Sequence, residues 1–228
     1  MKQVKHYLRV VLFGVCLGIF LVFVQRRIFH VETSEFLHWY WIAGALVVIG
    51  AVAFNILYTF QYGKKMRQAA ALLEAGENQA YINAMEALLK RAKGRYLKSL
   101  IRLNLSAGYC AAKRYSQAIS LLEPLPESWL LPDAKMVRRL NLCVCYFHSG
   151  QAAKGLALYD ESQEIFAPFR DSAYYGRNMA MLDMLAGLAQ GRYEEVQAML
   201  DAAREKWNLP RFHEDYQRLQ EELDDAGK

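Results

Sequence analysis

The residues of this chain that could carry chemistry include one suggestive pair near its middle. Tyr109 and Lys113 are spaced Tyr-x-x-x-Lys, and residues four apart lie on the same face of a helix. A lysine so placed can lower the pKa of a tyrosine and make it a general acid, as in dehydrogenases with this spacing. Such an enzyme also needs a glycine-rich nucleotide-binding turn, which the sequence lacks. Because the chain has 14 tyrosines, one such spacing is expected by chance, and we predict that Tyr109 is a packing residue.

Two other groups contain residue types that bind metals. Cys143, Cys145 and His148 lie close together, but residues two apart on a helix point in nearly opposite directions, so the two thiols cannot bind one ion. His213 and Glu214 begin a short run without the H-E-x-x-H spacing of a zinc protease. We therefore expect no metal, and we expect the two cysteines to be small, buried, apolar residues.

No other enzyme motif is recognisable. The sequence has neither the G-x-S-x-G turn of a hydrolase nor a phosphate-binding glycine loop. We expect a protein that is not an enzyme and that needs no cofactor and no small-molecule substrate. An enzyme with an unrecognised site is the alternative, but no polar residue stands out as its centre.

The elements that hold these residues are predicted to be helices. Of the 228 residues 54% are hydrophobic, but only 5 are prolines, and turn pairs such as Asn-Gly are few. Four cysteines without a regular spacing indicate reduced thiols rather than a disulfide framework. The net charge of +5 is too small to predict nucleic acid as a partner. The fold class predicted is all-α.

Two apolar segments near the N-terminus predict a membrane anchor. Residues 10–24 and 39–60 contain no charged side chain, and about 20 apolar residues cross the roughly 30 Å hydrocarbon layer of a bilayer. We expect spanning helices at about 8–28 and 38–61, which form a hairpin within an anchor of residues 1–62. A cleaved signal peptide followed by one anchor is the alternative, but the first segment ends without a small-residue cleavage site.

Basic residues predict the orientation of this anchor. Lys64, Lys65 and Arg67 follow the second segment and three basic residues precede the first, whereas two glutamates balance Arg26 and Arg27 in the loop. Cytoplasmic flanks of membrane helices carry an excess of lysine and arginine. We therefore expect a multi-pass protein of the plasma or inner membrane with both termini in the cytoplasm.

After residue 62 the sequence repeats one pattern. In its clearest copy Leu105, Ser106 and Tyr109 precede a turn, and Ala118 and Leu122 follow it. This pattern resembles the tetratricopeptide repeat (TPR), a helical hairpin of about 34 residues with L-G-x2-Y in its first helix and A-x3-F in its second. Leu142, Cys143 and Tyr146 carry the first part of the pattern in the next copy, and Gly191, Tyr193, Val196 and Leu200 carry the second part in a third.

The resemblance implies a membrane-anchored, TPR-like α-solenoid. Its repeat domain spans residues 63–228. The units expected are about 64–92, 95–126, 132–168 and 171–208, with an amphipathic capping helix at 210–225 that covers the last apolar face.

Two surfaces are candidates for binding. In TPR proteins the first helix of each pair lines the concave face that holds the partner. Its expected residues here are Leu100, Leu103, Ala107, Val137, Leu140, Val144, Phe147, Asn178, Met181 and Leu185. A basic surface expected to lie against anionic lipid consists of Lys64, Lys65, Arg67, Lys90, Arg91, Lys93 and Arg95.

The function expected is a membrane-anchored scaffold or adaptor that binds a protein or peptide partner. The apolar face favours an amphipathic helix or an extended apolar peptide. The alternatives are that the face is internal core or is covered by the capping helix or another subunit, and that the protein is a chaperone-like assembly factor that shields apolar segments.

Overall fold

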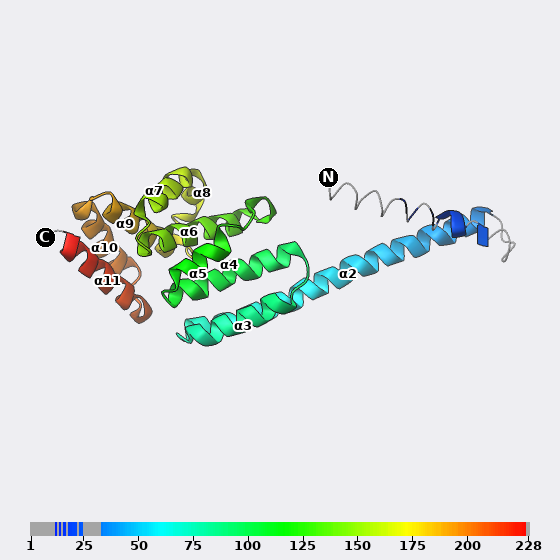
Figure 1. Ribbon diagram of the computed structural model, residues 1–228, viewed down its shortest axis with the longest axis horizontal. Helices are drawn as coiled ribbons and strands as arrows, with labels where there is room; N and C mark the ends of the chain where they lie inside the picture. The colour runs from blue at the N-terminus through cyan, green and yellow to red at the C-terminus, as the bar shows by residue number, and fades with distance from the viewer. Residues whose placement is uncertain are drawn as a thin grey trace. The chain divides into compact units, whose positions relative to one another are not determined.

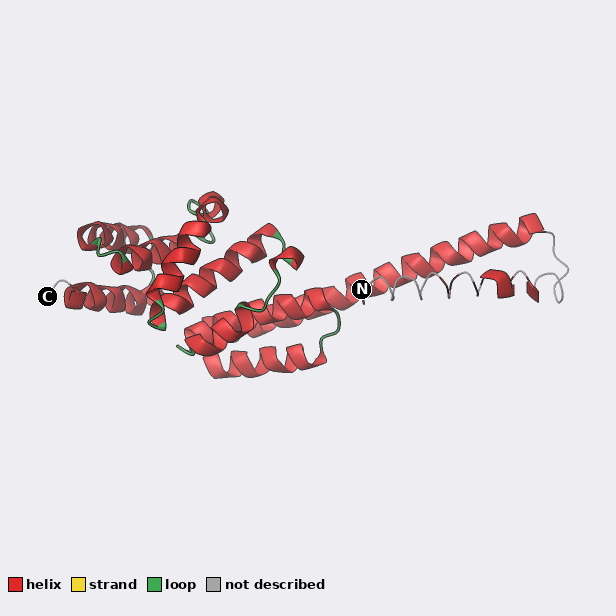
Figure 2. Ribbon diagram, turned by 45° about the horizontal axis from the view of Figure 1, so that its top comes forward, coloured by secondary structure: helices red, strands yellow, loops and turns green. Residues whose placement is uncertain are grey.

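The computed structural model describes residues 12, 14, 16, 18–21, 23–24 and 33–226 of the chain. Every regular element of this described part is helical (Figure 2), which confirms the all-α class predicted from the sequence. The chain divides between Gln61 and Tyr62 into two compact units.

The first unit contains most of α2 (Thr33–Glu74), which continues into the second unit. Among the described residues, α2 is the one helix that is long and apolar enough to cross a membrane, over Leu37–Glu74. Its apolar side chains are exposed, and Val47 and Phe54 are each 72% exposed. An apolar surface of this length is compatible with lipid rather than with water.

The expected first spanning helix, at about 8–28, lies largely outside the described residues. The described residues between 12 and 24 are helical. The two-helix hairpin and its orientation in the membrane therefore stay predictions.

The end of α2 differs from the expectation. The spanning helix was expected to end at about residue 61 and the first repeat to begin at about 64, but α2 runs without interruption to Glu74. The residues after Gly63 are mostly lysine, alanine, leucine and glutamine, which favour helix, so nothing stops the helix there. The helix ends at Glu74 and is followed by a turn at Gly76, where the amide of Glu77 donates to the carbonyl of Leu72 over 2.9 Å.

The second unit is a row of helices that alternate with tight turns (Figure 1). After α2 its helices are α3 (Asn78–Arg91), α4 (Arg95–Ala111), α5 (Tyr115–Leu122), α6 (Pro132–His148), α7 (Ala152–Glu161), α8 (Gln163–Phe166), α9 (Gly176–Ala189), α10 (Tyr193–Lys206) and α11 (His213–Ala226). Three short 3-10 turns, which the sequence pattern did not predict, are η2 (Glu127–Trp129), η3 (Ala167–Phe169) and η4 (Pro210–Phe212). The first helices of successive pairs are neighbours, because α6 contacts both α4 and α9.

The turns between paired helices recur at a fixed spacing. Gly76, Lys113, Gly150 and Gly191 are the turn residues, with φ angles of 78°, 58°, 75° and 76°. The first three are 37 residues apart, and the fourth follows after 41. This period is longer than the roughly 34 residues of a tetratricopeptide repeat. In its turn, Lys113 has the left-handed backbone conformation that glycine adopts in the other three turns.

Close packing between neighbouring helices depends on a small residue of α4. A Cβ atom on Gly108 would lie 2.4 Å from Cδ1 of Tyr81 in α3, so only glycine fits there without a shift of the ring. The hydroxyl of Tyr81 donates to the carbonyl of Asn104 over 2.8 Å. These contacts fix how α3 lies against α4.

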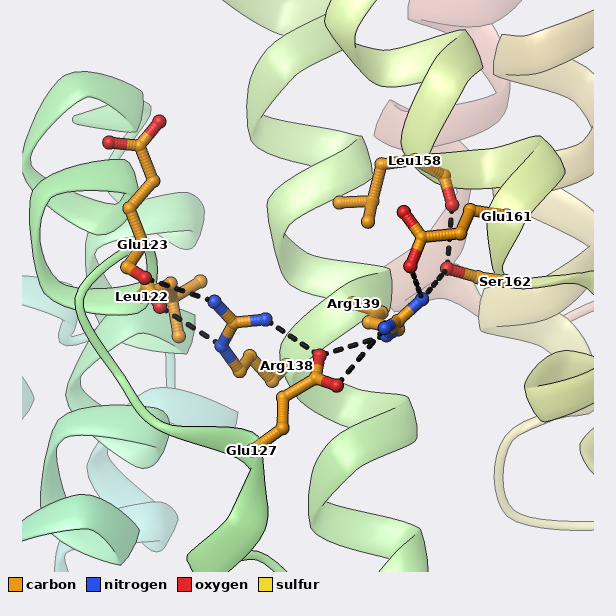
Figure 3. A network of polar contacts seen from close by, with 8 residues as sticks. All are labelled: Leu122, Glu123, Glu127, Arg138, Arg139, Leu158, Glu161 and Ser162. Atoms are coloured by element: carbon orange, nitrogen blue, oxygen red, sulfur yellow. Dashed lines mark hydrogen bonds and ion pairs between the residues drawn. The ribbon is translucent and has the colours of Figure 1, made fainter.

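A partly buried carboxylate joins three segments of the chain (Figure 3). Glu127, in η2, accepts two hydrogen bonds from Arg139 at 2.8 and 3.0 Å and one from Arg138 at 2.8 Å. Arg138 also donates to two carbonyls at the end of α5, and Arg139 donates to Glu161 at the end of α7 over 3.0 Å. Paired in this way, the two arginines of α6 hold the hairpins before and after it in place.

Candidate functional site

Tyr109 and Lys113 do not form an acid and base pair. Tyr109 is buried, and its hydroxyl donates to the carboxylate of Glu86 over 2.5 Å. Lys113 lies in the exposed turn, with its Nζ atom 3.7 Å from Glu214. Burial and the neighbouring Glu86 raise the pKa of Tyr109, whereas a tyrosine that acts as an acid near neutral pH needs a lowered pKa.

The cysteines of α6 make separate contacts. The sulfur of Cys145 lies 2.8 Å from that of Cys110 in α4, whereas Cys143 is buried in an apolar cluster with Met136. The ring of His148 stacks on Tyr115 with 5.1 Å between the centroids, and burial lowers the pKa of His148 to about 4. Within the described part of the chain, no three His, Cys, Asp or Glu residues are placed to hold a metal ion.

The candidate site is a hollow of about 500 Å³ on the side of the second unit where α4, α6 and α9 lie. We call it the α4–α6–α9 hollow. Its lining residues are Leu73, Leu100, Leu103, Asn104, Ala107, Asp133, Ala134, Val137, Leu140, Asn141, Tyr174, Tyr175 and Asn178. The lining is therefore mainly apolar, with three amides and a single charged side chain.

The hollow brings together six of the ten residues predicted for the concave face. They come from three helices that are separate in the sequence and are Leu100, Leu103, Ala107, Val137, Leu140 and Asn178. Leu103 and Leu140 are buried in its floor, whereas Asn178 is exposed.

The remaining four predicted residues lie outside the α4–α6–α9 hollow. They pack against a cluster that includes Tyr216, Leu219 and Leu223 of α11, and they are Val144, Phe147, Met181 and Leu185. Helix α11 packs against α10 through this cluster, and Val144, Met181 and Leu185 also line a smaller hollow beside it. Both the capping role of this helix and the partner-binding role of the predicted face stay predictions.

A smaller hollow of about 200 Å³ separates α11 from the open part. It shares Leu140, Asn141 and Asn178 with the α4–α6–α9 hollow. At its far side Arg177 pairs with Asp215 of α11 over 2.5 Å, and its guanidinium carbon lies 3.7 Å from the centre of the ring of Phe212. The paired side chains of Arg177 and Asp215 form a polar wall of this smaller hollow.

Sequence reasoning missed seven lining residues of the hollow, namely Leu73, Asn104, Asp133, Ala134, Asn141, Tyr174 and Tyr175. Tyr174 is 81% exposed and its ring meets that of Tyr175 edge-on. These tyrosines precede α9, in a segment that the pattern did not assign to a binding face. Asn104 and Asn141 did leave a signal, because they are 37 residues apart and Asn178 follows after another 37.

The predicted basic surface lies in the part of the second unit nearest to residue 62 in sequence. Its seven residues are all exposed. Lys64, Lys65 and Arg67 lie in α2 just after residue 62. The other four lie at the end of α3, in the loop that follows it and at the start of α4. Because α3 runs back along the C-terminal part of α2 (Figures 1 and 2), both sets lie at the same end of this hairpin.

The chain matches no protein-family model, no curated protein and no solved structure. The resemblance to the tetratricopeptide repeat therefore stays a hypothesis that rests on the residues quoted for it. The function is argued below from the hollow and from α2.

Proposed function

We propose that this protein is a membrane-anchored scaffold whose TPR-like second unit binds a polypeptide partner in the α4–α6–α9 hollow. The open hollow is the observation that carries the proposal. Its volume of about 500 Å³ lies in the usual range of binding sites, and apolar walls with a few polar groups are typical of them. The exposed ring of Tyr174 is a residue type enriched in protein interfaces.

The chemistry of the lining favours binding over catalysis. Asp133 is the one charged residue among those that line the hollow, and the other ionisable groups there are the hydroxyls of Tyr174 and Tyr175. Burial raises the pKa of Tyr175, so this hydroxyl is neutral at physiological pH. Neither a nucleophile next to a base nor a pair of carboxylates is present in the lining.

The membrane anchor gives the scaffold its mechanism. Two spanning helices, of which α2 is the described one, would hold the second unit at the cytoplasmic face. A partner in the same membrane then meets the hollow at a raised effective concentration, and a modest intrinsic affinity is sufficient.

A chaperone-like role fits the hollow less well. A site that shields many apolar segments needs a broad, uniformly apolar face, but the lining of the α4–α6–α9 hollow includes Asp133 and three asparagines. These polar groups indicate a more selective partner.

The basic surface would strengthen attachment to the membrane. Each lysine or arginine near an anionic membrane contributes about 1 kcal/mol, and seven exposed cations are clustered here. Amide hydrogen exchange of residues 90–95 should be slower in nanodiscs of phosphatidylglycerol than in nanodiscs of phosphatidylcholine. Equal rates in both lipids would remove this part of the proposal.

Photocrosslinking in native membranes tests the binding proposal. A benzoylphenylalanine at position 174, in the hollow, should give a discrete polypeptide adduct, and adding Val137→Asp should abolish it. The matched control is the same probe at Tyr193, an exposed tyrosine of α10 outside the hollow. Identical products from both positions, or adducts with lipid alone, would refute the proposal.

A further inference from the structure

The α4–α6–α9 hollow contains a regular set of amides. Asn104, Asn141 and Asn178 each come from the first helix of a different pair, and each follows the one before by 37 residues. The last pair has four extra residues before its turn, so Asn178 lies one helical turn earlier than its counterparts, on nearly the same face. All three line the same hollow.

These amides retain unused hydrogen-bonding capacity. The side-chain nitrogen of Asn104 donates to the carbonyl of Leu100 over 2.9 Å, and that of Asn141 donates to Ser106 over 3.3 Å. An asparagine amide has two N–H donors and an oxygen that accepts two bonds. No residue in the described part donates to the oxygens of Asn104 and Asn141, and the amide of Asn178 has no protein partner there.

The spacing of the helices matches an extended chain. Packed helices lie about 8–10 Å apart, and α6 contacts both α4 and α9. An extended or polyproline II chain advances about 3.1–3.4 Å per residue. Successive asparagines would therefore meet every third residue of a chain that crosses the three helices.

The amides of the hollow distinguish an extended ligand from a helical one. In a helical ligand the backbone N–H and C=O groups bond to one another, so only its side chains could pair with the asparagines of the hollow. An extended segment has free backbone N–H and C=O groups, and an asparagine side chain can accept a hydrogen bond from the first and donate one to the second. Asp133, the single charged residue of the lining, disfavours acidic side chains in the ligand.

We propose that the hollow binds an extended polypeptide segment with apolar side chains and no acidic residue, whose backbone groups pair at every third residue with Asn104, Asn141 and Asn178. This inference rests on the proposed function and specifies the conformation and charge of its partner. The apolar residues of the floor contact the side chains of the segment, and the amides hold its main chain.

A defined peptide probe tests the inference. Random linear 12-residue peptides displayed on phage are selected against the full-length protein in nanodiscs, with empty nanodiscs as the counter-selection. The affinity of the best peptide is then measured by fluorescence anisotropy for the wild type and for Asn104→Leu/Asn141→Leu. Asn83→Leu is the matched control, because Asn83 is an exposed asparagine of α3 outside the hollow.

The expected result is a loss of affinity of at least tenfold for the double variant and no change for the control. N-methylation of the peptide backbone at every third residue, in one of the three possible registers, should reproduce the loss with the unaltered protein. This second arm does not depend on how well the variants fold. A version of the peptide held helical by a side-chain staple should bind more weakly.

Two other outcomes distinguish a failure of this inference from a failure of the proposed function. Peptides that lose affinity with Val137→Asp but not with the asparagine variants or N-methylation, or that bind better when helical, would overturn this inference and leave the proposed function standing. If no peptide binds above empty nanodiscs, or if Val137→Asp has no effect, the proposed function fails together with the inference.

Discussion

The hydroxyl of Tyr109 donates to the carboxylate of Glu86 over 2.5 Å, and the same pair recurs 37 residues later, where Tyr146 donates to Glu123 over 2.7 Å. In each pair the tyrosine lies in the first helix of a hairpin and the glutamate lies 23 residues earlier, at or just before the end of the preceding hairpin. Tyr109, the tyrosine that suggested catalysis, therefore makes a contact between hairpins that recurs at Tyr146.

Removal of either hydroxyl should lower stability. Tyr109→Phe and Tyr146→Phe should each reduce the free energy of unfolding by about 1 kcal/mol, the typical net value of a hydrogen bond. Urea unfolding of the full-length protein in detergent, followed by circular dichroism, measures this loss. Tyr96→Phe is the control, because Tyr96 is an exposed tyrosine of α4. An unchanged midpoint in both variants would show that the pairs do not stabilise the fold.

Replacement of Lys113 should raise stability. Its φ of 58° is strained for a residue with a side chain, and glycine adopts it freely. Lys113→Gly should therefore stabilise the protein by about 1 kcal/mol, since the exposed contact with Glu214 contributes little.

The reciprocal change at the next turn is the matched control. Gly150→Lys should destabilise by a similar amount, because φ there is 75° and no atom lies within 4 Å of the added Cβ, which leaves conformation as the cost. Thermal unfolding of both variants decides the matter. Shifts of the same sign would contradict the assignment of equivalent turns.

Much of the helical organisation could be predicted from the sequence because turn residues and small packing residues leave local signals. Gly191, which belongs to the repeat pattern, indicated one of the turns. The continuity of α2 could not be predicted this way, because a change from apolar to charged residues marks the end of a membrane span but does not stop a helix. The short turn around Glu127 was also missed, since its contacts are with residues of α6 that follow in sequence.

Stability should depend on pH through Glu127. Hydrogen bonding to Arg139 is the main cause that lowers the pKa of Glu127 below the ordinary value of 4.5. A carboxylate with a lowered pKa contributes stability above its unfolded pKa, and this contribution is lost as the pH falls through its folded pKa. Wild type should therefore exceed Glu127→Gln by about 1–3 kcal/mol at neutral pH, and the difference should shrink below about pH 4.5.

Urea midpoints measured from pH 3 to 7 provide the test. Glu164→Gln is a suitable control, because Glu164 is an exposed glutamate that forms no ion pair among the described residues. A difference between wild type and Glu127→Gln that stays constant with pH would contradict the role given to this carboxylate.

The thiols of Cys110 and Cys145 should form a disulfide under mild oxidation. Their sulfur atoms lie 2.8 Å apart, so little movement is needed, and diamide supplies the oxidant by accepting the two electrons and two protons. The reaction should be slow at neutral pH, because hydrogen bonding to Cys145 and burial raise the pKa of the Cys110 thiol, and the thiolate is the attacking species.

Mass spectrometry after alkylation under denaturing conditions identifies the product. Cys110→Ser should abolish the disulfide, and Cys143→Ser should leave it unchanged, since Cys143 lies in a different cluster. If both thiols are still alkylated after oxidation of the wild type, the helices do not hold them in contact.

The candidate site was harder to predict than the fold. Periodicity placed Leu103, Leu140 and Asn178 on one face because the first helices of the pairs share a register. It did not show that Phe147 and Leu185 pack in a cluster with residues of α11, since the position of a final helix depends on tertiary contacts such as that between Arg177 and Asp215. Tyr174 was missed because it lies before its helix, where a periodic pattern gives no information.

The central claim is that a polypeptide occupies the α4–α6–α9 hollow in the membrane. Hydroxyl-radical footprinting of Tyr174 tests it most directly, by comparison of its oxidation rate in native membranes with that in the purified protein in nanodiscs. We predict that Tyr174 is protected several-fold in native membranes, whereas Tyr193 reacts equally in both preparations. Equal oxidation of Tyr174 in both preparations would contradict the account.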